Sequence, residues 1–157
     1  MNEKSEIKII GYDFDGVMTD NCAYVDENGR ESVKVNRSDG MAVNLIKNLG
    51  YQQFILSSES NPVVKERAKK LDIDCFNGIE DKLLKINSVA SNNQLSLDNF
   101  LFIGNDINDK EVLENVGFPF CPEDAADEIK AICTVINRKG GDGVIRELYN
   151  LLILRKT

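Results

Sequence analysis

The chain has 157 residues, 42% of them hydrophobic, and carries a net charge of −7 from 19 basic and 26 acidic residues. This length suffices for one hydrophobic core, so we expect a single domain over residues 1–157. The acidic balance gives no electrostatic basis for binding nucleic acid or an anionic membrane surface, and no apolar run reaches the roughly 18 residues of a membrane helix. The opening segment MNEKSE lacks the layout of a signal peptide, and we therefore expect a cytoplasmic protein.

Histidine is absent from the chain. Its absence excludes a serine triad, a phosphohistidine intermediate and a histidine-ligated metal. The four cysteines are widely scattered, so neither a zinc site nor a disulfide framework is indicated, and reduced thiols are expected. Any catalysis must therefore rest on carboxylates, hydroxyls, lysine, arginine or an oxygen-ligated cation.

Apolar runs of strand length alternate with longer segments of helical period along the chain. Strands are expected near residues 7–12, 53–58, 75–78, 100–104, 118–121 and 134–137, and helices near 41–49, 62–71, 81–90, 109–116, 125–132 and 142–153. Gly50 suits a left-handed helix end, and Asn61 followed by Pro62 suits a helix start. This alternation predicts an α/β fold with a central parallel sheet and helices on both faces.

Residues 21–37 interrupt the alternation. The segments CAYV and ESVKV flank Asn28 and Gly29, a dipeptide that favours a type I′ turn. We therefore expect a β-hairpin inserted after the first strand.

Polar side chains follow several of the predicted strands. Their carboxyl ends meet at one edge of a parallel sheet, where ligands bind in open α/β folds, so we expect these side chains to converge. Clustered carboxylates without histidine suit Mg²⁺, and such a site suits phosphoryl transfer. The candidates are Asp13, Asp15, Ser57, Ser58, Lys82, Asn105, Asp106 and Asp109.

Asp13 and Asp15 are two residues apart, which on an extended chain places both side chains on one side. We expect Asp13 to act as nucleophile and Asp15 as general acid and base. Ser57 would donate a hydrogen bond to phosphate, and Lys82 would neutralise its charge.

Each motif taken alone has a simpler interpretation. An isolated D-x-D-G more often marks a turn, a cap or a calcium loop, but a calcium loop starting at Asp13 would place Tyr24 where a glutamate is needed. Ser57 alone could cap a helix, and Lys82 alone could be a solvated surface lysine. Their joint occurrence at successive strand ends favours the catalytic interpretation.

The motifs DFDGVMTD, ILSSES, DKLLKI and GNDIND resemble the four motifs of the haloacid dehalogenase superfamily, over nearly the whole chain. The hairpin, VNRSDGMAV and NRKGGDGVIREL narrow the resemblance to the capless subfamily that dephosphorylates 3-deoxy-manno-octulosonate 8-phosphate and nonulosonate 9-phosphates. The phosphatase-like domain of acylneuraminate cytidylyltransferases is similar too. The resemblance implies a three-layer sandwich without a large cap domain.

The resemblance also implies site residues and an assembly. Asp13 and Asp15, the latter through its backbone carbonyl, would bind Mg²⁺ together with Asn105 and Asp106, and Asp109 would support them. A homotetramer is implied, in which the hairpins cover a neighbour's active site. The tail would add substrate contacts at Arg138, Lys139, Gly140 and Gly141, although the glycines suit an ordinary flexible turn equally well.

Two departures from the family pattern bear on activity. The octulosonate-phosphate enzymes carry glycine and arginine where this chain has Ser58 and Glu59, which resembles the nonulosonate-specific relatives. Glu59, Arg67 and Lys70 then become candidate sugar contacts, or the last two are only the polar face of a helix. Many relatives have aspartate at the position of Asn105. Its uncharged amide should weaken metal binding unless Asp106 takes over as the ligand.

Two alternatives to an enzyme remain open at this point. One is an inactive oligomerisation or regulatory module that retains the scaffold. The other is a phospho-accepting receiver domain, which the sequence disfavours because Asn77 and Gly78 stand at the third strand end in place of an acceptor aspartate.

Overall fold

The computed structural model describes residues 6–156, and its centre is a six-stranded, fully parallel sheet with the strand order β5-β4-β1-β6-β7-β8. The order places β1 between β4 and β6, so that the carboxyl ends of these three strands are neighbours. The strands are β1 (Ile9–Tyr12), β4 (Gln52–Leu56), β5 (Asp74–Phe76), β6 (Phe100–Ile103), β7 (Phe118–Pro122) and β8 (Thr134–Ile136).

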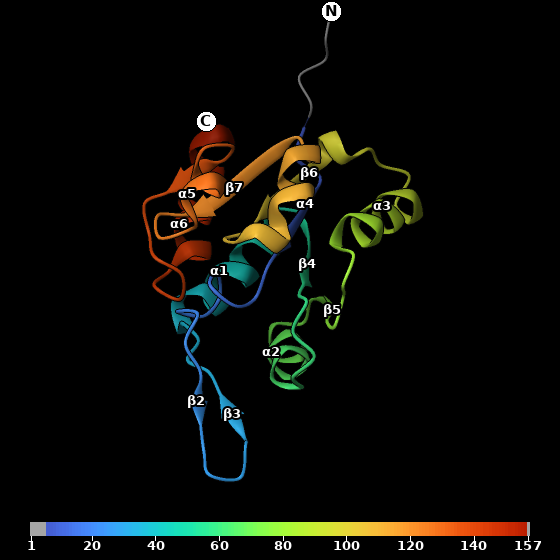
Figure 1. Ribbon diagram of the computed structural model, residues 1–157. Helices are drawn as coiled ribbons and strands as arrows, with labels where there is room; N and C mark the ends of the chain where they lie inside the picture. Colours follow the sequence, from blue (N-terminus) through green and yellow to red (C-terminus); the bar gives the residue numbers. More distant parts are fainter. Residues whose placement is uncertain (1–5, 157) are drawn as a thin grey trace, which may run out of the picture.

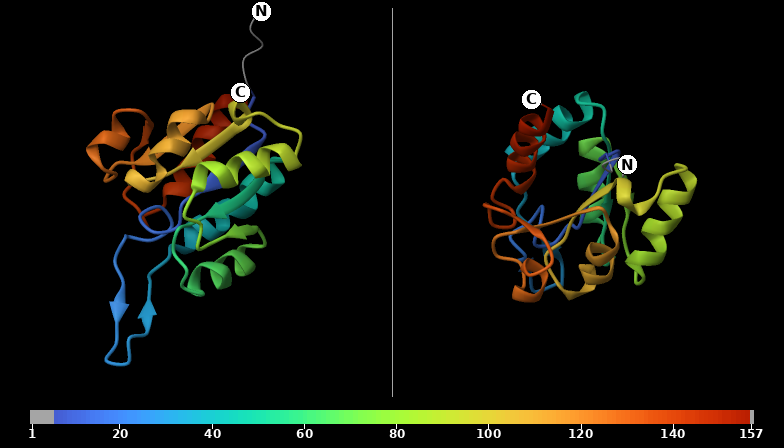
Figure 2. Two further views of the ribbon diagram at one scale, coloured as in Figure 1. Left: turned by 45° about the vertical axis from the view of Figure 1, so that its right-hand side comes forward. Right: turned by 90° about the horizontal axis from the view of Figure 1, so that it is seen from above.

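Helices cover both faces of the sheet (Figure 2). The α-helices are α1 (Arg37–Asn48), α2 (Val63–Leu71), α3 (Lys82–Asn92), α4 (Lys110–Asn115), α5 (Asp127–Lys130) and α6 (Val144–Lys156), with short 3₁₀ helices η1 (Leu97–Asn99) and η2 (Ile107–Asp109). Two separate core clusters give the layers: one joins the sheet to α1, α2 and α6, the other joins it to α3, α4 and α5.

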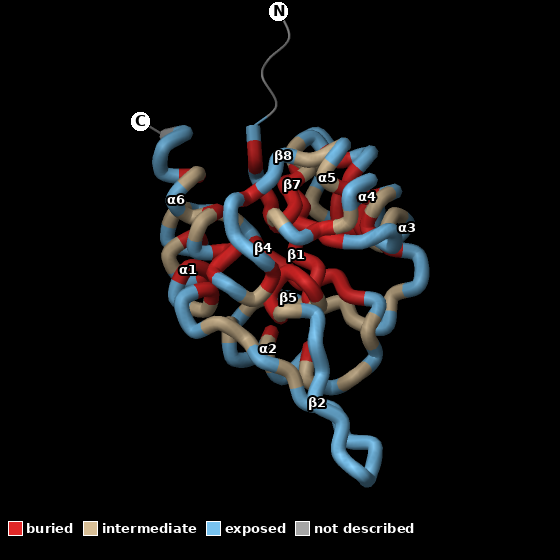
Figure 3. Tube along the Cα trace, turned by 60° about the vertical axis from the view of Figure 1, so that its left-hand side comes forward, coloured by how far each residue is buried: buried red, intermediate tan, exposed pale blue. Residues whose placement is uncertain are grey.

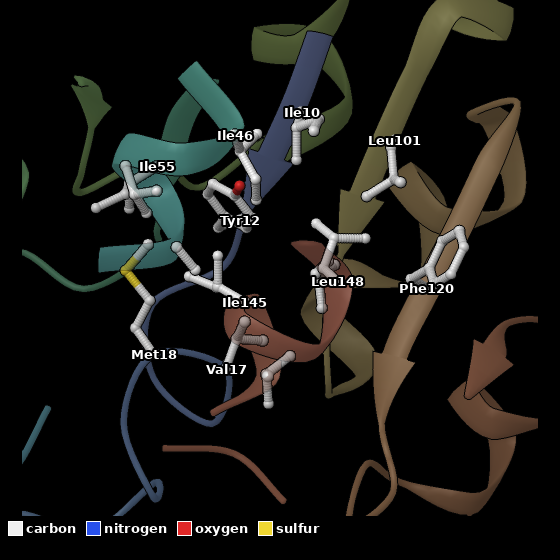
Figure 4. Close-up of a cluster of buried hydrophobic side chains, with 14 of the residues drawn as sticks. Ile10, Tyr12, Val17, Met18, Ile46, Ile55, Leu101, Phe120, Ile145 and Leu148 are labelled. Atoms are coloured by element: carbon white, nitrogen blue, oxygen red, sulfur yellow. The ribbon is translucent and has the colours of Figure 1, made fainter. Parts of the chain in front are cut away.

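The alternation of side chains along β1 explains the two cores. Ile10 and Tyr12 point into the first cluster, where Figure 4 shows them beside Ile46 of α1 and near Ile145 and Leu148 of α6. Ile9 points into the second cluster. Because successive residues of a strand face opposite sides, a strand covered by helices on both faces is apolar throughout.

The inserted segment forms the antiparallel hairpin of β2 (Tyr24–Val25) and β3 (Glu31–Ser32), which extends away from the sheet (Figure 1). Both strands are exposed along their length (Figure 3). No large cap domain is inserted within residues 6–156, so the predicted fold class is confirmed. None of the helices in this part of the chain is long and apolar enough to span a membrane.

The predicted type I′ turn of the hairpin is wrong. That turn needs a positive φ at both Asn28 and Gly29, but only Gly29 has one, at 76°. Instead, Gly29 N donates to Asp26 O, and the Asp26 carboxylate accepts from the backbone of Asn28 and Arg30. Asp26 favours this arrangement because its side chain satisfies two loop N–H groups, and Gly29 supplies the left-handed residue of a three-residue loop.

Candidate active site

The carboxyl ends of β1, β4 and β6 surround a cavity of about 270 Å³. Polar residues from all three strand ends line it, as the sequence predicted. The lining residues are Asp13, Asp15, Asn21, Ser57, Ser58, Glu59, Asn105, Asp106 and Asn108. A larger hollow of about 500 Å³ lies at the opposite edge, beside the first residues of β4 and β5, and holds none of the predicted site residues.

Asp13 directly follows β1 and is 5% exposed. Its Oδ1 accepts a hydrogen bond from Lys82 Nζ at 2.9 Å, and the same Nζ donates to Asp109 Oδ1 at 2.7 Å. Burial raises the pKa of Asp13 to about 7, and the charge of Asp109 adds to this rise while Lys82 opposes it. Burial lowers the pKa of Lys82, but the two carboxylates outweigh it and leave that pKa raised, so Lys82 is a cation.

Lys82 reaches this position because α3 begins at it, with Asp81 as N-cap accepting from Leu84 N. The side chain is 3% exposed, so the interpretation as a solvated surface lysine is wrong. One cation between two buried carboxylates holds Asp13 in a fixed orientation, since each charge would be costly to bury without a partner.

Asp15 lies outside the extended strand, contrary to the prediction of a shared extended segment. β1 ends at Tyr12, and the chain turns so that Met18 N donates to Phe14 O. Asp15 nevertheless lines the same cavity as Asp13. Burial raises the pKa of Asp15, and the hydroxyl of Thr19, which donates to its Oδ1 at 3.2 Å, works against that rise.

Asn105, 8% exposed, follows β6 and brings its amide to the corner between Asp13 and Asp15. One end of the amide lies 2.9 Å from Asp13 Oδ2 and 3.0 Å from Asp15 O. If that end is Nδ2, it donates two hydrogen bonds; if it is Oδ1, three oxygens converge and the amide nitrogen faces only donors. Three converging oxygens fit a hard cation such as Mg²⁺.

The donor set carries little charge. Within residues 6–156 there is no group of three or more His, Cys, Asp or Glu side chains placed to hold a metal. The candidate set is one carboxylate, one amide and one backbone carbonyl. Asp106, the other predicted ligand, lines the cavity, but its Oδ1 accepts from Ile107 N at 2.7 Å, so the geometry favours Asn105.

Asp109 is fully buried behind these residues. Its Oδ2 accepts from Asn105 N at 2.9 Å and from Asp106 N at 3.4 Å, while its Oδ1 binds Lys82. Asp109 therefore fixes the loop after β6 to the lysine that holds Asp13.

Ser57, Ser58 and Glu59 follow β4 on the other side of the cavity. Ser57 is 2% exposed, and its Oγ accepts from Glu59 N at 3.1 Å. Glu59 Oε1 in turn accepts from Asn61 N at 2.8 Å, which orients the carboxylate at the start of α2. Among residues 6–156 the hydroxyl proton of Ser57 has no acceptor, so it can be donated to a ligand.

Two predicted sugar contacts lie outside the cavity lining. Arg67 is half-buried in α2, and its Nη2 donates to Asn36 O at 3.1 Å, beside Gly40 of α1. Lys70 is exposed on the same helix. Within one chain, therefore, these two residues belong to the helix packing and the surface rather than to the cavity.

The tail glycines pack on the turn that follows β1 in the same chain. A Cβ at Gly140 would lie 2.1 Å from Gly16 O, and one at Gly141 would lie 2.6 Å from Asp20 N. Gly141 N also donates to Val17 O at 3.0 Å. The neighbouring Arg138 and Lys139 are exposed, and neither lines the cavity of its own chain.

Three residues of the site were not found from the sequence. Thr19 Oγ1 accepts from Gly16 N and Asn21 N and donates to Asp15, and Asn21 and Asn108 line the cavity. Asn21 has a φ of 64°, a conformation that asparagine adopts more readily than most residues. Only the position of Thr19 shortly after Asp15 could have indicated its role.

Comparison with known proteins identifies the family of the chain. A family model described as haloacid dehalogenase-like hydrolase matches residues 66–148. The 3-deoxy-D-manno-octulosonate 8-phosphate phosphatase KdsC of Salmonella typhimurium is 27% identical over 156 residues, which are 98% of this chain and 83% of that protein.

Two solved structures share the fold. A Streptomyces avermitilis protein described as a HAD family hydrolase is 36% identical, with a TM-score of 0.90, covering 94% of this chain and 91% of its own. The 3-deoxy-D-manno-octulosonate 8-phosphate phosphatase of Moraxella catarrhalis, solved with magnesium, phosphate and KDO, is 25% identical, with a TM-score of 0.91, covering 96% of this chain and 88% of its own. The motifs, the fold and these similarities agree: the chain belongs to the haloacid dehalogenase-like hydrolases.

Proposed function

We propose that the chain is an Mg²⁺-dependent phosphatase of a phosphorylated 2-keto-3-deoxy sugar acid, either a nonulosonate 9-phosphate or 3-deoxy-D-manno-octulosonate 8-phosphate. That it is a phosphatase of sugar phosphates follows from its family and relatives. Because the chain belongs to this hydrolase family, we reject the alternative of a phospho-accepting receiver domain. The observation that carries the proposal is the buried Asp13, held between Lys82 and Asn105 on the cavity wall.

The side chains at the cavity suit a two-step displacement. An oxygen of Asp13 attacks phosphorus, the bond from phosphorus to the sugar oxygen breaks, and the leaving oxygen takes a proton from Asp15. Asp15 then accepts a proton from water as the water oxygen attacks phosphorus. The bond to Asp13 breaks, and inorganic phosphate leaves with Asp13 again a carboxylate and Asp15 again protonated.

The other residues position and neutralise the phosphoryl group. Ser57 offers a hydroxyl proton, and Lys82 offers the positive charge nearest to Asp13. When bound to Asp13, Asp15 O and Asn105, Mg²⁺ would offset the repulsion between the nucleophile and the phosphate. Burial keeps these charge interactions strong, because water screens them poorly there.

The charge of the cavity bears on substrate and assembly. Of the nine lining residues, four are acidic and none is basic. A sugar acid brings a carboxylate that needs a cation, and the exposed Arg138 and Lys139 of a second copy are suitable donors. This requirement supports a homotetramer in which neighbouring chains complete each other's cavities.

The test is phosphate release from a panel of 3-deoxy-D-manno-octulosonate 8-phosphate, a nonulosonate 9-phosphate and a neutral hexose phosphate, each with Mg²⁺ or EDTA. We expect hydrolysis of a sugar-acid phosphate only with Mg²⁺. The variant Asp13→Asn should lose at least about a thousandfold in kcat/KM, as nucleophile removal does elsewhere.

Asp72→Asn is the matched control, since Asp72 lies at the remote hollow, paired with Lys47, and should leave activity unchanged. Wild-type activity no higher than that of Asp13→Asn would refute hydrolysis. It would favour the alternative of an inactive oligomerisation or regulatory module.

A further inference from the structure

Asn105 carries the further inference, because its amide occupies the corner where two oxygens already meet. The geometry points to two orientations of this amide. Without a cation, Nδ2 faces Asp13 Oδ2 and Asp15 O and donates a hydrogen bond to each; when Mg²⁺ binds, the amide turns and Oδ1 takes the place of Nδ2. The second half of this inference rests on the proposed function, whereas the first half concerns the protein alone.

Both ends of the Asn105 amide fit the corner between Asp13 and Asp15. The amide end that faces Asp13 Oδ2 at 2.9 Å and Asp15 O at 3.0 Å makes two good hydrogen bonds as nitrogen and none as oxygen. The two ends of an amide have nearly the same size and shape. A half-turn of the amide therefore exchanges donor for acceptor without new space.

The Asn105 amide is closely packed by its neighbours. A Cβ on Gly16 would lie 2.0 Å from Asn105 Nδ2 and 2.6 Å from its Cγ, so the amide packs directly on the Gly16 backbone. The backbone N–H of Asn105 is held by Asp109 at 2.9 Å. These contacts hold the backbone of Asn105 and one side of its amide, so rotation of the amide is the change that needs the least displacement of its neighbours.

An aspartate at position 105 would be less favourable than asparagine in the absence of a metal. Asp13 already has a raised pKa because it is buried, and Lys82 engages only its Oδ1. An aspartate at position 105 would place a second carboxylate about 3 Å from Asp13 Oδ2, and the two would repel each other unless they held a proton between them. The amide avoids this repulsion, so the corner is satisfied without a metal, and Mg²⁺ must displace two hydrogen bonds to enter.

Thermal unfolding of Asn105→Asp tests both halves. In EDTA the variant should melt about 3–8 °C below the wild type, from two lost hydrogen bonds and added repulsion. With saturating Mg²⁺ its melting temperature should rise more than that of the wild type, and its Kd for Mg²⁺, by calorimetry, should be on the order of tenfold tighter. Asn115→Asp is the matched control, an exposed asparagine at the end of α4, outside the cavity lining, that should show neither effect.

A second measurement uses the wild type alone, in case Asn105→Asp fails to fold. The side-chain NH₂ resonances of Asn105, assigned from the backbone by NMR, should exchange slowly with solvent in EDTA and shift on Mg²⁺ titration. A variant in EDTA that melts at or above the wild-type temperature would overturn the inference. So would Mg²⁺ stabilisation of the wild type that leaves these resonances unmoved.

The outcomes separate this inference from the proposed function. Absence of phosphate release from every substrate, beside the expected melting and NMR changes, would contradict only the proposed function. Absence of any Mg²⁺ effect in both proteins would overturn the metal half of the inference together with the proposed metal dependence.

Discussion

Asp39 is a buried carboxylate that serves a helix junction rather than the cavity. It lies in the first turn of α1, is 3% exposed, and its Oδ1 accepts from Arg146 N in the first turn of α6 at 3.0 Å. Its Oδ2 has no hydrogen-bond partner in the described part of the chain. Burial raises the pKa of Asp39 to about 6 from the ordinary 3.8, although the backbone N–H groups of Arg146 and Ile145 oppose the rise.

This pKa gives stability a definite dependence on pH. Between about pH 4 and 6 the folded protein holds a proton on Asp39 that the unfolded chain has released. The contribution to the free energy of unfolding is therefore fully present below pH 3.8, the ordinary pKa, and is lost as the pH rises through 6. Asp39→Asn, which keeps the acceptor oxygen without the charge, should be about 1–2 kcal/mol more stable than the wild type at pH 7.5.

Urea unfolding of both proteins at pH 4 and pH 7.5 measures the difference, which should be much smaller at pH 4. Asp142→Asn removes an exposed carboxylate just before α6 and should change stability by no more than about 0.5 kcal/mol at either pH. If Asp39→Asn is instead less stable than the wild type at pH 7.5, the attraction between the Asp39 carboxylate and the N-terminus of α6 outweighs the cost of burying that carboxylate.

At the residue scale, the sequence predicts candidates better than it predicts their partners. The strand ends deliver Asp13, Ser57 and Asn105 to one cavity because parallel strands share an edge, and this follows from local patterns alone. The choice between Asn105 and Asp106 depends on loop geometry after β6, which no local pattern fixes. Lys82 looked equally suited to the surface, because its burial depends on where α3 begins relative to Asp13 and Asp109.

The segment before α6 and the turn after β1 form one packed unit at the scale of elements. Gly140 lies against Gly16 O, and its N–H donates to Asp124 Oδ1 at 2.9 Å. Since Gly16 directly follows Asp15, any displacement of this contact moves the proposed acid and base. The sequence left this segment open between substrate contact and flexible turn, because a glycine-rich pattern does not reveal what the backbone approaches.

Gly140→Ala should therefore reduce both stability and catalysis. Its Cβ would lie 2.1 Å from Gly16 O and 2.9 Å from Thr19 O, and backbone atoms cannot yield as a flexible side chain can. We expect a loss of about 2–3 kcal/mol in the free energy of unfolding, from overpacking. We also expect kcat to fall at least about tenfold in protein that is still folded, since small misplacements of catalytic groups are costly.

Gly117→Ala is the matched control for that variant. Its Cβ would lie 2.2 Å from Asp98 O, a comparable clash, but Gly117 precedes β7 at the opposite edge of the sheet. This variant should lose similar stability and keep its kcat. Equal kcat values for the two folded variants would show that the tail segment does not position the turn.

At the scale of the whole molecule, the hairpin is the feature that the fold of one chain does not explain. It extends away from the sheet (Figure 1). Its strand β2 presents Tyr24 at 72% and Val25 at 64% exposure. Two neighbouring apolar side chains on an exposed strand need cover, since an uncovered strand edge favours association. The acidic cavity needs a cation from elsewhere for a sugar acid, so one assembly could meet both needs.

The combined variant Tyr24→Asp and Val25→Asp tests this assembly. By light scattering after size-exclusion chromatography, the wild type should show four times the 17.6 kDa mass of one chain, and the variant a lower mass. The dissociated variant should remain folded, because strands β2 and β3 of the hairpin lie outside both core clusters. Leu84→Asp, which changes an equally exposed apolar residue of α3, should remain a tetramer. The KM for the sugar-acid phosphate then shows whether the assembly takes part in substrate binding. If neighbouring chains supply the missing cation, KM rises on dissociation, although Asp13 and Lys82 stay in place. An unchanged KM in a dissociated variant would place substrate recognition within one chain.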